Sequence, residues 1–193
     1  MTGYIGIGIM LNEKSDSGLF YNCLDTMKQD LVSGNEVREA LALSTLGNIG
    51  SPYLAQELAP AVIHKTLSEN RSCPLYVKKK ACMCLLSFLR REKQIYDKDL
   101  WVQGLHGLLK STNYGLLLSA CSLMKGTIKM FGHEGFESLV PQLVIILSHI
   151  QEYAQDYYYY MTPCPWLQVK ILQIIQLFPP PPTNSQLLND INS

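Results

Sequence analysis

The sequence predicts an all-α fold, an armadillo- or HEAT-like solenoid in which pairs of helices stack along the chain. Three observations predict it. Apolar residues recur with helical spacing along nearly all of the 193 residues, a pattern of about 40 residues repeats, and strand signals are weak. Apolar residues make up 47% of the chain and charged residues 17%, which supports a large buried core.

The helical period is clearest in the predicted helix 75–91. Its apolar residues fall on one stripe, at i, i+4, i+7, i+8 and i+11: Val77, Ala81, Cys84, Leu85 and Phe88. The same test predicts helices at 3–12, 19–33, 36–49, 53–69, 75–91, 98–110, 114–131, 134–152, 165–178 and 184–191. Glycine and proline mark the breaks, as in Gly50-Ser51-Pro52. Tyr157–Tyr160 has high β-propensity but lacks a partner run, so we expect no sheet.

An internal repeat groups these helices into pairs. Ala40, Ala81 and Ala120 occupy corresponding points of three helices, spaced by 41 and 39 residues. A fourth copy runs through 166–178, after a longer connection. The small residue in each copy lets neighbouring helices approach closely. One helix pair cannot bury its apolar stripe alone, so we expect successive pairs to stack.

We find no pattern that indicates catalysis, a cofactor or a metal. Gly3, Gly6 and Gly8 lack the order of a dinucleotide-binding motif. Cys82 and Cys84 fall on different faces of one helix, and no histidine is spaced to complete a zinc site. We interpret the six cysteines as reduced and mostly buried. The sequence leaves open whether a cysteine and a histidine meet in space, but it predicts no enzyme.

The basic cluster Lys78, Lys79 and Lys80, with Arg90 and Arg91 one helix length away, is a candidate contact for an acidic partner or lipid headgroup. The alternative is a solvated helix end. Basic and acidic residues balance at 16 each, and aromatic residues do not alternate with the lysines, so we expect no nucleic-acid partner. No apolar run reaches the roughly 18 residues of a transmembrane helix.

Tyrosines and prolines mark a second candidate contact. Tyr158 lies in the tyrosine run, and Trp166 opens the next predicted helix; both residue types are favoured at interfaces. The alternative is a connection between repeats that packs on its own array. Residues 179–183 form a proline-rich connection between helices. As an alternative, Pro179 to Pro182 offer an extended ligand to a proline-binding domain.

Residues 156–172 carry a resemblance to a known family. The pattern Pro-x-Pro-Trp-Leu-x-Val-Lys over 163–170, preceded by tyrosines and followed by a proline run, resembles the adaptin large-subunit family, and within it the alpha type. Lys79-Lys80-Ala81 resembles another helix of that family. Cys164 and Gln173 depart from the family pattern.

The resemblance implies that residues 1–193 are a single segment of the adaptin N-terminal trunk, truncated relative to the family. It implies a structural scaffold in a clathrin adaptor complex, acting in endocytosis and vesicle-mediated protein transport. Implied partners are a small sigma-type chain, a second large chain and a medium chain. Implied localisation is cytoplasmic, peripheral on the cytosolic face of the plasma membrane in coated pits.

An alternative function is a general armadillo-type module that binds extended peptides or proteins. Such modules often carry an asparagine ladder on the inner helices of their repeats. Asn48 and Asn113 do not form such a ladder in the sequence, which disfavours this alternative.

Overall fold

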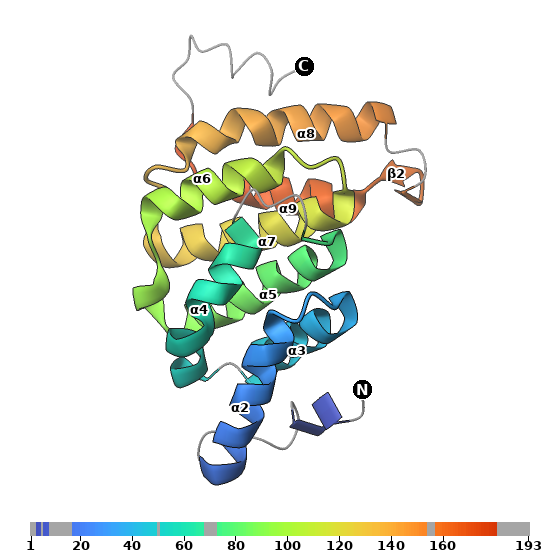
Figure 1. Cartoon of the computed structure of the whole chain (residues 1–193). Helices are drawn as coiled ribbons and strands as arrows, with labels where there is room; N and C mark the ends of the chain where they lie inside the picture. The colour runs from blue at the N-terminus through green and yellow to red at the C-terminus, as the bar shows by residue number, and fades with distance from the viewer. Residues whose placement is uncertain are drawn as a thin grey trace. The chain divides into compact units, whose positions relative to one another are not determined.

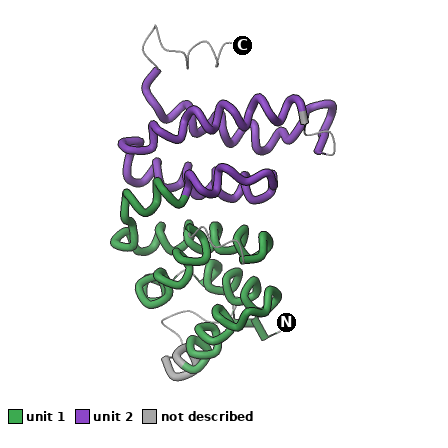
Figure 2. Tube along the Cα trace, turned by 45° about the horizontal axis from the view of Figure 1, so that its top comes forward, with its two compact units in different colours: residues 1–104 green, residues 105–193 purple. Residues whose placement is uncertain are grey.

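The computed structural model describes residues 3–4, 6–7, 17–49, 51–67, 73–153 and 157–180, and these residues are mainly helical (Figure 1). The α-helices are α2 (Ser17–Leu31), α3 (Glu36–Ile49), α4 (Pro52–Leu67), α5 (Leu75–Arg91), α6 (Lys98–Leu109), α7 (Tyr114–Phe131), α8 (Val140–Tyr153) and α9 (Pro165–Ile175). Short elements between them are the 3-10 helices η1 (Lys93–Ile95) and η2 (Glu137–Leu139) and the strands β1 (Tyr158–Tyr159) and β2 (Thr162–Pro163). The chain divides into two compact units, residues 1–104 and 105–193 (Figure 2).

In the first unit, α2 packs on α3, α4 packs on α5, and α3 packs directly on α5. The last contact joins helices one repeat apart, as the recurrence predicts. A glycine makes it close: a Cβ added to Gly47 would lie 3.3 Å from the Cα of Cys84. The Ser87 hydroxyl donates a hydrogen bond to the Gly47 carbonyl oxygen at 2.6 Å. The two helices therefore meet backbone to backbone along part of their length.

Polar and aromatic groups complete the interior of this unit. The buried Glu39 carboxylate accepts a bond from Lys65 Nζ at 2.8 Å and another from the Gly34 N–H at 3.1 Å. Trp101 is fully buried and forms a T-shaped pair with Tyr96, with ring centres 5.6 Å apart. The ion pair joins α3 to α4, and the indole anchors the start of α6 in the core.

In the second unit, α9 packs on both α7 and α8. Its core side chains come from all three helices and from the loop before α8, and include Leu123, Phe136, Leu143 and Ile171. Asn113 begins α7, where its side-chain oxygen accepts from the Leu116 N–H at 3.0 Å. The predicted fourth copy of the repeat is thus α9, which packs on α7, the helix one repeat before it.

The helix predictions at 36–49, 75–91 and 114–131 are confirmed at both ends. The single helix predicted at 134–152 is wrong at its start. Gly132 and Gly135 both adopt φ of +91°, a left-handed conformation that ends a helix, and α8 begins only at Val140. The helix predicted at 165–178 ends earlier, at Ile175. Pro179 follows closely, and the ring of a proline disfavours the helical conformation in the residue before it.

The expectation of no sheet is also wrong, although the sheet is small. Tyr158 pairs with Pro163 and Tyr159 with Thr162 in an antiparallel two-stranded hairpin. The turn residues Tyr160 and Met161 have φ of +47° and +61°. Two successive positive φ values characterise the two-residue turn that suits the twist of a hairpin. The partner strand was missed because that turn usually contains glycine or asparagine.

Some predictions lie outside the described residues. They are the helix at 184–191, most of the helix at 3–12, and residues 181–183 of the proline-rich connection. The interpretation of residues 1–193 as a single segment of a trunk domain stays a prediction.

Candidate binding grooves on the repeat helices

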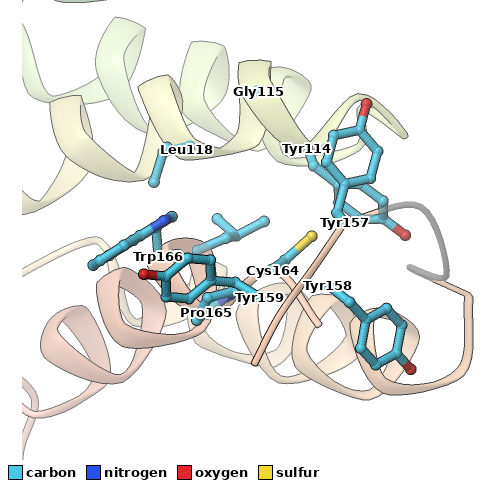
Figure 3. Close-up of a pocket in the computed structure, with 10 residues that line it drawn as sticks. Tyr114, Gly115, Leu118, Tyr157, Tyr158, Tyr159, Cys164, Pro165 and Trp166 are labelled. Carbon is cyan, nitrogen blue, oxygen red and sulfur yellow. The ribbon is translucent and has the colours of Figure 1, made fainter. Parts of the chain in front are cut away.

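A pocket of about 450 Å³ opens between the first turns of α7 and α9 (Figure 3). Its size falls within the range of about 300–1,000 Å³ that is typical of ligand sites. Trp166 and Tyr159 lie together at one side of it, and Tyr114 and Tyr157 at the other. The remaining lining residues are Gly115, Leu118, Tyr158, Cys164, Pro165 and Leu167. The pocket wall is therefore mainly aromatic.

The hairpin β1–β2 holds one wall of this pocket. The Cys164 N–H donates to the Tyr157 carbonyl oxygen at 2.8 Å, and Gln168 Nε2 donates to the Pro163 carbonyl oxygen at 2.6 Å. Cys164 has φ of +43°, and Pro165 takes the first position of α9. Proline suits that position because its missing N–H would have no helical partner there. These contacts tie the tyrosine run to the start of α9.

Lysines follow the pocket along the same two helices. Trp166 and Lys170 are four residues apart on α9, and Lys125 and Lys129 are four residues apart on α7, so each pair shares a helix face. Lys125 Nζ donates to Gln173 Oε1 at 2.6 Å, which joins the two helices. Burial, then the neighbouring charges of Lys129 and Lys170, lower the pKa of Lys125. Three positive charges therefore lie close together.

A second groove, of about 390 Å³, lies between α3 and α5 in the first unit. It has a more polar lining, to which Ser44, Asn48, Lys80 and Arg90 contribute. Lys80 Nζ lies 5.7 Å from the centre of the Tyr76 ring, within reach of a cation–π contact. Gly47 and Cys84, where the two helices come closest, also line this groove.

The predicted contact residues have separate places in the structure. Lys80 and Arg90 line one groove together, whereas Lys78 lies on another side of α5, where it influences the buried Cys82. Lys79 is half-buried and does not line that groove. The predicted Lys78–Lys80 cluster is therefore not one continuous patch. Tyr158 and Trp166 both line the aromatic pocket.

The α7 side of the aromatic pocket was not predicted from the sequence. Tyr114 and Leu118 come from a helix more than 40 residues before Trp166, and only packing brings them there. The lysines had a usable signal, since Lys125 and Lys129 repeat at helical spacing, as do Trp166 and Lys170. No segment of the sequence alone indicates that the two faces meet.

The buried cysteines are unsuited to nucleophilic chemistry at neutral pH. Burial raises the pKa of Cys82 and of Cys121 to about 12, and it raises the pKa of Cys84 as well. Their thiols stay protonated, and a protonated thiol is a poor nucleophile. Four of the six cysteines are buried, which confirms that most of them are buried; their reduced state stays a prediction.

Within the described ranges, no three histidine, cysteine, aspartate or glutamate side chains gather closely enough to hold a metal ion. Across the same residues, no helix has both the length and the apolar character that crossing a bilayer requires.

Paired helices whose equivalents one repeat apart pack on each other define a helical-repeat protein, which confirms the predicted fold class. The model of the adaptin N-terminal region matches residues 2–193, so the chain belongs to the adaptin family.

Three relatives indicate the type of adaptin. The chain is 36% identical over 180 residues to "AP-2 complex subunit alpha-1" of Arabidopsis thaliana, covering 92% of this chain and 17% of that protein. It is 34% identical over 184 residues to "AP-2 complex subunit alpha-2" of Dictyostelium discoideum, covering 93% of this chain and 18% of that protein. It is 29% identical over 195 residues to "AP-1 complex subunit gamma" of Dictyostelium discoideum, covering 98% of this chain and 21% of that protein. The chain thus spans about a fifth of the length of these relatives, and the predicted resemblance to the alpha type is confirmed.

Proposed function

We propose that this chain is a structural trunk segment of a clathrin adaptor complex, acting in endocytosis and vesicle-mediated protein transport. One observation carries the proposal: the chain is 34–36% identical to alpha subunits of AP-2 complexes along more than nine-tenths of its length. Over residues 1–193 it forms a single segment of the adaptin trunk. It works without catalysis, by holding binding surfaces in fixed positions.

The helix packing supports a mechanical role. In the first unit, α3 and α5 meet at Gly47, whose carbonyl oxygen accepts a hydrogen bond from the Ser87 hydroxyl, and the buried Glu39–Lys65 pair closes α3 onto α4. Such contacts resist sliding of one repeat over the next, because the side chains and backbone groups have specific partners. A stack of this kind presents the same surface in every molecule, which a scaffold requires.

The proposed partners are a small sigma-type chain, a second large chain and a medium chain. Through them the chain is held on the cytosolic face of the plasma membrane, in coated pits. Neither a cofactor nor nucleic acid takes part.

A direct test is co-purification. The tagged chain, expressed in cells, is expected to recover a sigma-type small chain of the AP-2 class, identified by mass spectrometry. The purified pair is expected to elute as one species from a sizing column. A folded chain that recovers an AP-1 small chain instead, or that recovers no adaptor subunit, would contradict the proposal.

The alternative of a general armadillo-type peptide-binding module lacks the support of an asparagine ladder. Asn113 is engaged as the N-cap of α7, where its side chain bonds the Leu116 N–H. Asn48 lines the groove between α3 and α5. The two asparagines therefore have unlike positions in their repeats.

A further inference from the structure

Four consecutive tyrosines, Tyr157 to Tyr160, reach solvent in and beside the hairpin β1–β2. Each of them is more than half exposed. Among the described residues, the other exposed tyrosines, Tyr53 and Tyr76, lie in the first turns of the helices α4 and α5. Hairpin backbone is extended and turns its side chains outward, so a phenol there is open to enzymes that modify tyrosine.

The four tyrosines face different groups, because side chains alternate along a strand. Tyr157 contacts Tyr114 edge to face, with ring centres 5.4 Å apart. Tyr159 lies beside Trp166, with ring centres 6.1 Å apart, and its hydroxyl is directed to the side of the pocket where Trp166 lies (Figure 3). The ring of Tyr158 points away from both pairs (Figure 3). The hairpin therefore places Tyr159 against the first turn of α9.

Three lysines follow from this turn along α9 and α7. Lys170 comes four residues after Trp166, about 6 Å along the helix axis, and shares its face of α9. Lys125 and Lys129 belong to α7, and Lys125 Nζ donates to Gln173 Oε1 at 2.6 Å, which joins the two helices at this level. A negative group on the Tyr159 hydroxyl would have Lys170 as the first cation beyond Trp166.

The charge of these lysines is uncompensated. Neither α7 nor α9 contains an aspartate or glutamate, and neither does the hairpin. The described carboxylates of this unit are Glu134, Glu137 and Glu152, and no ion pair joins one of them to the three lysines. Glu137 is engaged instead by the Gly135 N–H at 2.6 Å and by His133 at 3.1 Å. A dianionic group would complement this positive face.

We propose that Tyr159 is a phosphorylation site whose phosphate pairs with Lys170 and Lys125 and so fastens the hairpin to α9 and α7. A tyrosine kinase moves the terminal phosphoryl group of a nucleoside triphosphate to the phenolic oxygen. The new O–P bond forms as the bond to the leaving nucleoside diphosphate breaks, and the phenolic proton passes to a base of the kinase. The inference goes beyond the proposed adaptor function and does not depend on it.

The phosphate would hold a segment that packing holds weakly. Tyr160 and Met161 at the tip are 87% and 92% exposed, and both have positive φ, which costs a non-glycine residue about 1–2 kcal/mol. A phosphorylated tyrosine adds about 1.5 to 2 negative charges and three acceptor oxygens, enough for charge-assisted bonds to more than one lysine. Because Tyr159 also lines the aromatic pocket, its modification would narrow the pocket opening.

The first experiment maps the acceptor. The full chain is incubated with the catalytic domain of a broad-specificity tyrosine kinase and Mg-ATP, and mass spectrometry locates the phosphate. We expect Tyr159 to be the main acceptor. Tyr159→Phe should lose most of the incorporated phosphate, whereas Tyr158→Phe, the matched control from the other face of the same strand, should keep it. No incorporation, or incorporation chiefly at Tyr160 or Tyr76, would overturn the assignment of the site.

The second experiment tests the contact with the lysines and does not depend on a kinase. Phosphotyrosine is installed in place of Tyr159 by codon suppression, and in a separate protein in place of Tyr160. Phosphorus NMR then follows the second ionisation of each phosphate, which is normally near pH 6. Neighbouring positive charge favours the dianion, so we expect the pKa of the phosphate at position 159 to be lower by about 0.5 or more.

Lysine variants of the protein phosphorylated at position 159 complete the test. The triple change Lys125→Gln, Lys129→Gln and Lys170→Gln is expected to abolish the difference between the two phosphates. Its matched control, Arg91→Gln, Lys93→Gln and Lys98→Gln, removes three exposed basic residues of the first unit and should preserve it. Circular dichroism shows that each variant is folded. Equal pKa values at the two positions, or the same response to both triple changes, would overturn the proposed phosphate–lysine contact.

Discussion

Two pairs of helices one repeat apart, α3–α5 and α7–α9, occupy equivalent positions but meet in different ways. Between α3 and α5 a glycine and a serine bring the backbones into contact, and the groove above them has a polar lining. Between α7 and α9 the first turns are separated by an aromatic pocket whose wall is a strained hairpin.

The difference shows how one repeat architecture supports two tasks. A small residue at the contact lets helices close, and the closed contact contributes stability. At the first turns of α7 and α9, tyrosines and a tryptophan line a pocket instead, although the two helices pack on each other farther along. The comparison predicts that substitutions at the α3–α5 contact lower stability, while changes to exposed residues of α7 and α9 leave stability nearly unchanged.

The largest effect is expected from Gly47→Val. A branched side chain would press on the Cα of Cys84, which cannot move without shifting α5. We expect a loss of about 3 kcal/mol in the free energy of unfolding, the upper end for overpacking. Urea denaturation measures it. Met83→Ala, a change to a half-exposed residue of the same groove, is the control and should cost far less.

A pair of lysine substitutions sharpens the comparison. Lys65→Gln leaves the Glu39 carboxylate buried with the Gly34 N–H as its remaining partner among the described residues, and we expect a loss of about 2 kcal/mol. Lys125→Gln removes a lysine from the α7–α9 groove and should cost less than about 0.5 kcal/mol. Thermal unfolding of both variants compares them. Equal destabilisation would contradict the distinction between Lys65, which pairs with a buried carboxylate, and Lys125, which bonds a neutral amide.

The beginnings of α7 and α9 also differ. Asn113→Ala removes the N-cap of α7, so we expect a loss of about 1 kcal/mol. Asn113→Asp keeps an oxygen acceptor at the same place and should retain most of the stability. Denaturant unfolding measures both. A neutral Asn113→Ala variant would show that this cap is dispensable.

The smallest expected effect has the opposite sign. Met161→Gly removes the side chain from a position with φ of +61° that is almost fully exposed, so little packing is lost. Relief of backbone strain should raise the free energy of unfolding by about 0.5–1 kcal/mol. Met161→Ala keeps the strain and serves as the control. A destabilised glycine variant would mean that the turn is not strained.

The sequence predicts much of the fold and little of the sites. Helices with a clear stripe, such as 75–91, were located to the residue, because helical periodicity is a local property. The alanine recurrence likewise predicted the packing of α3 on α5. The start of α8 was missed because two glycines adopt positive φ, and the apolar pattern alone does not show backbone conformation.

The sites depend on which helix faces meet, and that is not local. Trp166 and Tyr158 were predicted as contacts from residue type, but Tyr114 and Leu118 complete the pocket only through packing of α7 on α9. Conversely, Lys78 and Lys80 are only two residues apart in sequence, yet they lie on different sides of α5. Residues two apart on a helix do not share a face.

The most direct test of the account is a disulfide between α3 and α5. A Cβ built on Gly47 lies 3.7 Å from the Cβ of Cys84, within the range of about 3.5–4.5 Å that a disulfide spans. Oxidative refolding of the Gly47→Cys variant, in which both thiols are exposed before the core closes, should therefore link the introduced thiol to Cys84, and peptide mapping would identify the bond. Gly6→Cys, placed where nothing lies within 4 Å, is the control. A folded Gly47→Cys protein that forms no bond to Cys84 would contradict direct packing of helices one repeat apart.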